Sequence, residues 1–79
     1  MVLVRYFAGA RAAAGCAEEK VEAETLEGLI TAVSEQHGAK LASVLTACSF
    51  LVDGLAARDR SAMLASGATV DVLPPFAGG

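Results

Sequence analysis

The feature that most constrains the fold is one amphipathic helix set among segments of alternating residues. Thr25 suits the N-cap position and Gly38 a C-terminal stop, so the pattern predicts a helix over Leu26–His37. A chain of 79 residues is a single domain with little core to spare. One helix must therefore cover one face of the sheet that the other segments form. The apolar residues of its stripe, at i, i+3, i+4 and i+7, are Leu26, Leu29, Ile30 and Val33.

The remaining segments read as strands and short connections. Turn residues bound the strands, and Asp53-Gly54 is a strong hairpin signal. We expect a short helical turn at 11–14 that Gly15 ends, and a turn or packed loop around 41–45. Residues 55–67 are expected to be irregular, with Met63 and Leu64 anchored in the core. The predicted strands are 2–7, 18–24, 49–52 and 69–73.

This order of elements predicts an α+β, ubiquitin-like β-grasp fold. The mixed sheet would have four or five strands, with one main helix packed on one face and the first and last strands as central neighbours. Arg5 marks the open face of the first strand, which leaves Phe7 on that face too. In the last strand Asp71 and Leu73 face outward. We therefore expect Phe7 and Leu73 to share the uncovered face of the sheet.

Composition excludes several classes of protein. A net charge of −3 without a basic cluster argues against nucleic acid as a partner. No apolar run reaches the ~20 residues that span a membrane, and no signal peptide is evident. Cys16 and Cys48 are wrongly spaced for zinc, so we expect no metal site and two free thiols in a cytoplasmic protein, with one disulfide as the alternative. With one histidine, His37, the chain lacks the groups of a complete enzyme.

The isolated polar residues favour ordinary structural roles. His37 ends the predicted helix and suits a surface position, where its charged form would favour the helix C-terminus. Cys48 suits a small buried position, whereas Cys16 follows a glycine in a loop and should be more exposed. The acidic residues expected on a solvated face are Glu18, Glu19, Glu22, Glu24 and Glu27.

The chain ends in Gly78-Gly79, shortly after Pro74-Pro75. One interpretation is a frayed terminus, because chain ends often lack order. The other is that the Gly79 carboxylate reacts, since residues without Cβ can enter a narrow channel. ATP would convert that carboxylate to an acyl-adenylate, and a sulfur nucleophile would then leave a thiocarboxylate. Such chemistry needs a flexible tail, here 74–79, on a rigid body of one domain covering 1–79.

Two segments resemble a known family. The first is 4–8 (VRYFA), followed by Arg11 and Gly15, and the second is 70–79 (VDVLPPFAGG). Together they resemble the MoaD proteins, the small sulfur-carrier subunit of molybdopterin synthase, within the ubiquitin-like MoaD/ThiS superfamily. The likeness covers essentially the whole chain, although Arg5 stands where many members have an apolar residue.

The resemblance implies a function without an active site in this chain. A MoeB-type activating enzyme would use ATP to adenylate Gly79, and a sulfur donor protein would complete the thiocarboxylate. A MoaE-type large subunit, in a heterotetramer, would take that sulfur for the dithiolene of molybdopterin. No cofactor would be bound stably, and the chain alone would not be an enzyme.

The candidate site residues follow from the tail and the open face. Gly79 carries the reacting carboxylate, while Gly78 and Ala77 would thread the partner's channel. The alternatives are a ThiS-like or other carrier for thiazole or cysteine synthesis, a ubiquitin-like protein modifier, or an interaction domain with an inert tail. The candidate partner-binding residues are Phe7, Arg11, Leu73, Pro75 and Phe76.

Overall fold

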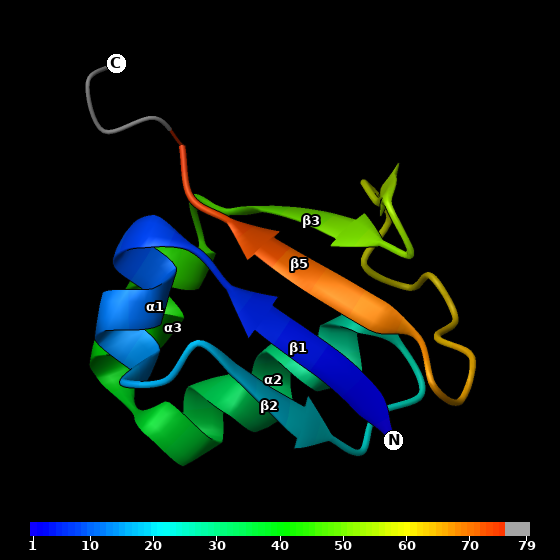
Figure 1. Cartoon of the computed structure of the whole chain (residues 1–79), viewed down its shortest axis with the longest axis horizontal. Helices are drawn as coiled ribbons and strands as arrows, with labels where there is room; N and C mark the ends of the chain where they lie inside the picture. The colour runs from blue at the N-terminus through cyan, green and yellow to red at the C-terminus, as the bar shows by residue number, and fades with distance from the viewer. Residues whose placement is uncertain (76–79) are drawn as a thin grey trace.

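The structure is a computed structural model that describes residues 1–75, and Figure 1 shows a twisted sheet with helices beside and behind it. The sheet has five strands in the order β2-β1-β5-β3-β4. Strands β1 and β5 are parallel neighbours, while the other pairs are antiparallel. This confirms the mixed sheet with its first and last strands adjacent at the centre. The strands are β1 (Val2–Tyr6), β2 (Glu18–Val21), β3 (Ser49–Val52), β4 (Leu55–Ala56) and β5 (Thr69–Leu73).

Helix α2 (Leu26–His37) has the predicted bounds and crosses behind the sheet in Figure 1. Its N-cap is Thr25, whose Oγ1 accepts a hydrogen bond from the Gly28 N–H at 3.0 Å. Helix α1 (Ala8–Ala14) begins three residues before the predicted turn, and 39–45 form a full helix, α3 (Ala39–Leu45). In the part of the chain that is described, no helix is long and apolar enough to span a bilayer.

The core lies between the sheet and α2. The inward alternation predicted for β1 and β5 is confirmed, because Val4, Tyr6, Val70 and Val72 are all fully or almost fully buried. All four residues of the α2 stripe are buried against them. The predicted hydrophobic core is therefore correct at the centre of the molecule.

The segment before β5 departs from the prediction. Met63 is 75% exposed, whereas Leu64 is 7% exposed and joins the core. Met63 forms an isolated antiparallel bridge with Thr25, so the chain is locally extended there. Successive side chains of an extended chain point to opposite sides, and only one of the two can be buried. The prediction that Met63 is anchored in the core was therefore wrong.

The Asp53-Gly54 turn is confirmed, and it leads into a strand that the sequence did not predict. Asp53 and Gly54 both have positive φ, at 50° and 84°. A two-residue turn of this kind joins antiparallel strands with the right twist, so the chain returns beside β3 as the short strand β4. With only two residues, β4 is too short to show an alternating pattern.

Two polar residues also depart from their predicted surface positions. Glu19 and Val21 are two residues apart in β2, so both point toward the helix side of the sheet. Glu19 is half-buried and accepts a hydrogen bond from Tyr6 Oη at 2.7 Å. His37 is half-buried against the same carboxylate. The prediction that Glu19 and His37 are solvated surface residues was wrong.

The stability of so small a core depends on each buried leucine. Leu29→Ala is expected to lower the free energy of unfolding by about 2–5 kcal/mol, because Leu29 is 0% exposed and its removal leaves a cavity. Leu55→Ala is the matched control, since Leu55 is 74% exposed, and its effect should stay within about 0.5 kcal/mol. Urea unfolding followed by circular dichroism measures both. Equal losses would contradict this assignment of the core.

Candidate functional site

An apolar groove lies at the end of the sheet where β5 leads toward the C-terminus. Its volume is about 660 Å³. Every residue that lines it is apolar or a glycine, although it opens to solvent. We call it the exit groove, and its lining residues are Phe7, Ala8, Gly9, Val44, Ala47, Leu73, Pro74 and Pro75.

Phe7 reaches the groove because β1 ends just before it. The Phe7 N–H donates to the Val72 carbonyl at 3.2 Å, which extends the pairing of β1 with β5 by one residue. The Phe7 carbonyl then accepts from the Ala10 N–H at 3.0 Å, so the same residue starts α1. Its backbone is therefore fixed at both ends, while its half-buried ring remains available at the groove.

The turn from β1 into α1 is strained at the groove wall. Ala8 has φ of 49°, a left-handed conformation that costs a residue with a Cβ roughly 1–2 kcal/mol. Gly9 follows it and also lines the groove. Small residues at these two positions keep this side of the groove open beside the Phe7 ring.

An ion pair on the open face of the sheet lies next to Phe7. Arg5 and Asp71 are cross-strand partners in β1 and β5, and the guanidinium donates to both carboxylate oxygens, at 2.6 and 3.0 Å. The Arg5 Cζ also lies 5.9 Å from the centre of the Phe7 ring. Asp71 faces outward as predicted, yet it is only 9% exposed because Arg5 covers it. Arg5 thus pairs with Asp71 across the two central strands and also contacts the ring of Phe7, which lines the groove.

Two lining residues of the groove come from a segment that the sequence did not assign to a site. Val44 lies in the last turn of α3, and Ala47 follows that helix with its N–H bonded to the Val44 carbonyl at 3.1 Å. Because α3 packs beside α1, these residues line the same groove as Phe7 and Leu73. The apolar spacing at 41–45 predicted that this segment packs against the rest of the protein, but it did not predict that the segment packs against α1.

The structure brings three predicted partner-binding residues together. Phe7, Leu73 and Pro75 all line the exit groove, at the end of the sheet and between strands and helices. Arg11 is exposed on α1 and is not among the lining residues. The four other predicted site residues, Phe76, Ala77, Gly78 and Gly79, lie outside the described residues.

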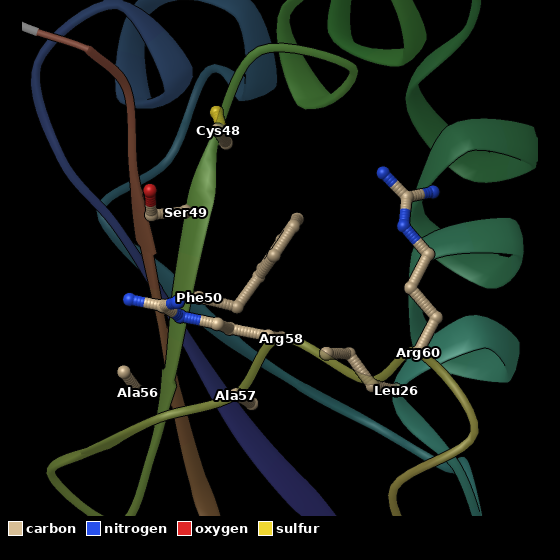
Figure 2. Close-up of a pocket in the computed structure, with 8 residues that line it drawn as sticks. All are labelled: Leu26, Cys48, Ser49, Phe50, Ala56, Ala57, Arg58 and Arg60. Atoms are coloured by element: carbon tan, nitrogen blue, oxygen red, sulfur yellow. The ribbon is translucent and has the colours of Figure 1, made fainter.

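A second pocket lies between β3 and the start of α2, and Figure 2 shows its lining side chains. Its volume is about 370 Å³. The Phe50 ring points from β3 into this space, and two arginines, Arg58 and Arg60, flank it. Their guanidinium groups point in different directions, so they do not converge on one anion.

The comparisons with known proteins agree with this architecture. Residues 4–79 match the ThiS family. A search of curated protein sequences finds no significant match.

Solved structures share the fold over nearly the whole chain. The small archaeal modifier protein 1 of Methanosarcina acetivorans is 21% identical, with a TM-score of 0.86 over 99% of this chain and 95% of that one. Subunits 1 and 2 of a molybdopterin-converting factor from Helicobacter pylori form a complex whose matching chain is 23% identical, with a TM-score of 0.75 over 99% and 97%. The BexX/CysO complex of Amycolatopsis orientalis has a matching chain that is 20% identical, with a TM-score of 0.80 over 100% of both chains. These likenesses confirm the ubiquitin-like β-grasp fold.

Proposed function

Because the chain belongs to the ThiS family, we propose that it is a sulfur carrier whose C-terminal Gly79 is converted to a thiocarboxylate. The matched region runs to the last residue and so includes the terminal Gly78-Gly79. The fold is the ubiquitin-like β-grasp, and on this proposal the chain carries sulfur without catalysing the reaction itself. Partner proteins therefore supply the catalytic side chains.

The observation that carries the proposal is the position of the exit groove. Pro74 and Pro75 line it, so the chain enters its final segment directly beside an apolar surface. Proline fixes φ and favours an extended chain, so Pro74 and Pro75 restrict the backbone where it leaves β5. A partner that covers the groove would hold this end of the chain at a defined distance from its own active site.

The chemistry at Gly79 takes two steps. The carboxylate oxygen attacks the α-phosphorus of ATP, and pyrophosphate leaves to give an acyl-adenylate. A persulfide sulfur on a donor protein, or sulfide, then attacks the acyl carbon and AMP leaves with the bonding electrons. With a persulfide donor, a reductant such as a second thiol must cleave the S–S bond to release the thiocarboxylate. A MoeB-type enzyme would perform the adenylation, so ATP is its substrate and no cofactor stays on the carrier.

We further propose that the carrier is the small subunit of a molybdopterin synthase. The Helicobacter pylori complex of molybdopterin-converting factor subunits 1 and 2 supports this, because its matching chain has the same fold. A MoaE-type large subunit would cover the exit groove in a heterotetramer and take sulfur for the dithiolene of molybdopterin. Two free cysteines in the structure agree with a cytoplasmic location, where thiols stay reduced.

A second candidate has support of its own. The modifier protein of Methanosarcina acetivorans has a TM-score of 0.86, and the CysO structure also matches over the full chain. Transfer of the activated Gly79 acyl group to a lysine would make the chain a protein modifier. Donation of its sulfur to a different acceptor would place it in thiazole or cysteine synthesis. All these uses share the adenylation step.

Intact-mass measurement tests the proposal. The full chain is incubated with a MoeB-type activating enzyme, ATP and a sulfur source, and we expect a sulfur-for-oxygen mass shift confined to its C-terminal peptide. Addition of a MoaE-type subunit and the pyranopterin precursor should then produce molybdopterin and return the carrier to its original mass. No shift would contradict the sulfur-carrier proposal. A shift without molybdopterin would favour a carrier for another pathway, and isopeptide-linked products would favour a modifier.

A further inference from the structure

A cluster of three potential metal ligands lies on the helix side of the sheet, away from the exit groove. Cys16, Glu19 and His37 each offer one ligand atom, and these atoms all lie within 4.8 Å of one another. All three residues are half-buried. They come from the loop after α1, from β2 and from the last residue of α2, so only the folded chain brings them together. Among residues 1–75, no other group of three such side chains comes as close.

Neighbouring side chains hold the carboxylate and the imidazole in place. Tyr6 Oη donates to Glu19 Oε2 at 2.7 Å, and Gln36 Nε2 donates to Glu19 Oε1 at 3.0 Å. The rings of Tyr6 and His37 meet edge to face, with centres 6.1 Å apart and planes 85° apart. Such outer contacts orient metal ligands in known sites. The cluster is therefore pre-oriented rather than a chance meeting of surface groups.

The chemistry of the three groups selects a particular class of ion. A thiolate, an imidazole and a carboxylate are the ligand types that Zn²⁺ binds, whereas Mg²⁺ and Ca²⁺ prefer sites made only of oxygen. The thiolate of Cys16 and the carboxylate of Glu19 would together balance the charge of a divalent ion. The C-terminal end of α2, which carries His37, adds a dipole that favours a cation.

The required movement is small. Around a tetrahedral Zn²⁺, ligand atoms lie roughly 3.3–3.7 Å apart. The His37 Nε2 and Glu19 Oε2 atoms, now 2.5 Å apart, must separate slightly. The other ligand atoms, within 4.8 Å, must draw together by at most about 1.5 Å.

We propose that Cys16 Sγ, the Glu19 carboxylate and an imidazole nitrogen of His37 form a binding site for Zn²⁺, with water as the fourth ligand. The sulfur–hydrogen bond of Cys16 is replaced by a sulfur–zinc bond, and the proton leaves to solvent. The imidazole nitrogen that binds the ion must be unprotonated, so the hydrogen bond between His37 Nε2 and Glu19 is broken. One proton stays on the other ring nitrogen, and any second proton leaves to solvent. No change of oxidation state occurs. Three protein ligands are fewer than the four of a closed structural site, so the fourth position stays open to water. This site tethers the loop after α1 to β2 and the end of α2.

Cobalt substitution tests the site on the full-length chain without an affinity tag. Co²⁺ is added to metal-free protein, and we expect the visible bands of a tetrahedral ion together with a thiolate-to-cobalt band in the near ultraviolet. Zn²⁺ should remove these bands by displacement. Cys16→Ser should abolish the thiolate band and weaken Zn²⁺ binding at least about tenfold. Cys48→Ser is the matched control, because Cys48 is also half-buried but donates only to the Val44 carbonyl at 3.2 Å.

A second measurement guards against variants that fail to fold. Saturating Zn²⁺ should raise the thermal midpoint of the wild-type chain and of Cys48→Ser, because an ion that binds only the folded state stabilises it. It should raise the midpoints of Cys16→Ser and Glu19→Gln by clearly less, because weaker binding gives less stabilisation at the same Zn²⁺ concentration. The proposal is overturned if wild-type protein gives no tetrahedral bands. It is equally overturned if the thiolate band and the full midpoint shift survive Cys16→Ser, or disappear in Cys48→Ser.

Discussion

Deletion of Gly79 is expected to abolish both adenylation and the sulfur-for-oxygen mass shift, while the chain unfolds at the same urea concentration. The deletion moves the carboxylate onto Gly78, which shortens the reach of an extended chain by about 3.5 Å. A misplacement of 1 Å at a reacting group can reduce a rate by about 100-fold, so this loss of reach should leave no measurable activation. Glycine has no side chain, so the deletion removes no side-chain burial from the folded domain.

Two further variants separate the reach of the carboxylate from the shape of the tail. Gly79→Ala keeps the carboxylate in place but adds a Cβ, and it should also block activation if the partner's channel admits only glycine. Leu55→Ala changes an exposed residue on β4, so it should be activated like the wild type. The measurements are pyrophosphate release with the activating enzyme, and intact mass. Normal activation of the shortened chain would exclude Gly79 as the reacting residue.

The sequence predicted the parts of the fold that depend on local pattern. The stripe of α2, its Thr25 cap and the alternation of β1 and β5 each express a repeat that a few residues define. The hairpin at Asp53-Gly54 likewise depends on two adjacent residues. Strands β1 and β5 are parallel neighbours at the centre of the sheet. It was therefore enough to predict which of their side chains face outward in order to place Phe7 and Leu73 close together.

The sequence could not predict contacts that depend on how distant segments pack. Val44 and Ala47 complete the exit groove only because α3 lies beside α1, and nothing in their own pattern specifies that neighbour. Glu19 illustrates a second reason. It belongs to a run of acidic residues typical of a solvated strand, yet its position two residues before Val21 turns it toward Tyr6 and His37. The prediction placed Glu19 in solvent because of its charge. In the structure, the alternation of side chains along β2 decides which way Glu19 points.

The exit groove yields the second large expected effect, on binding of a MoaE-type large subunit. Ala47→Arg should weaken that binding at least about 30-fold, equivalent to about 2 kcal/mol, the loss typical of a residue central to an interface. Ala47 is exposed, so the longer side chain should not disturb the core. In the complex, however, it would fill the groove and bring a charge into an apolar contact with no acidic partner among the lining residues.

A matched control separates the groove from a general effect of added charge. Ala65→Arg makes the same substitution at an exposed residue before β5, whereas the groove lies where that strand ends. Isothermal titration calorimetry should give this variant the wild-type dissociation constant, and thermal melting should show that both variants fold. If Ala47→Arg binds as tightly as the control, the large subunit must dock elsewhere. The open face around Arg5 and Asp71 would then be the surface to test. Asp71 lies in β5, the strand that leads to the C-terminal segment, and Arg5 is its partner in β1.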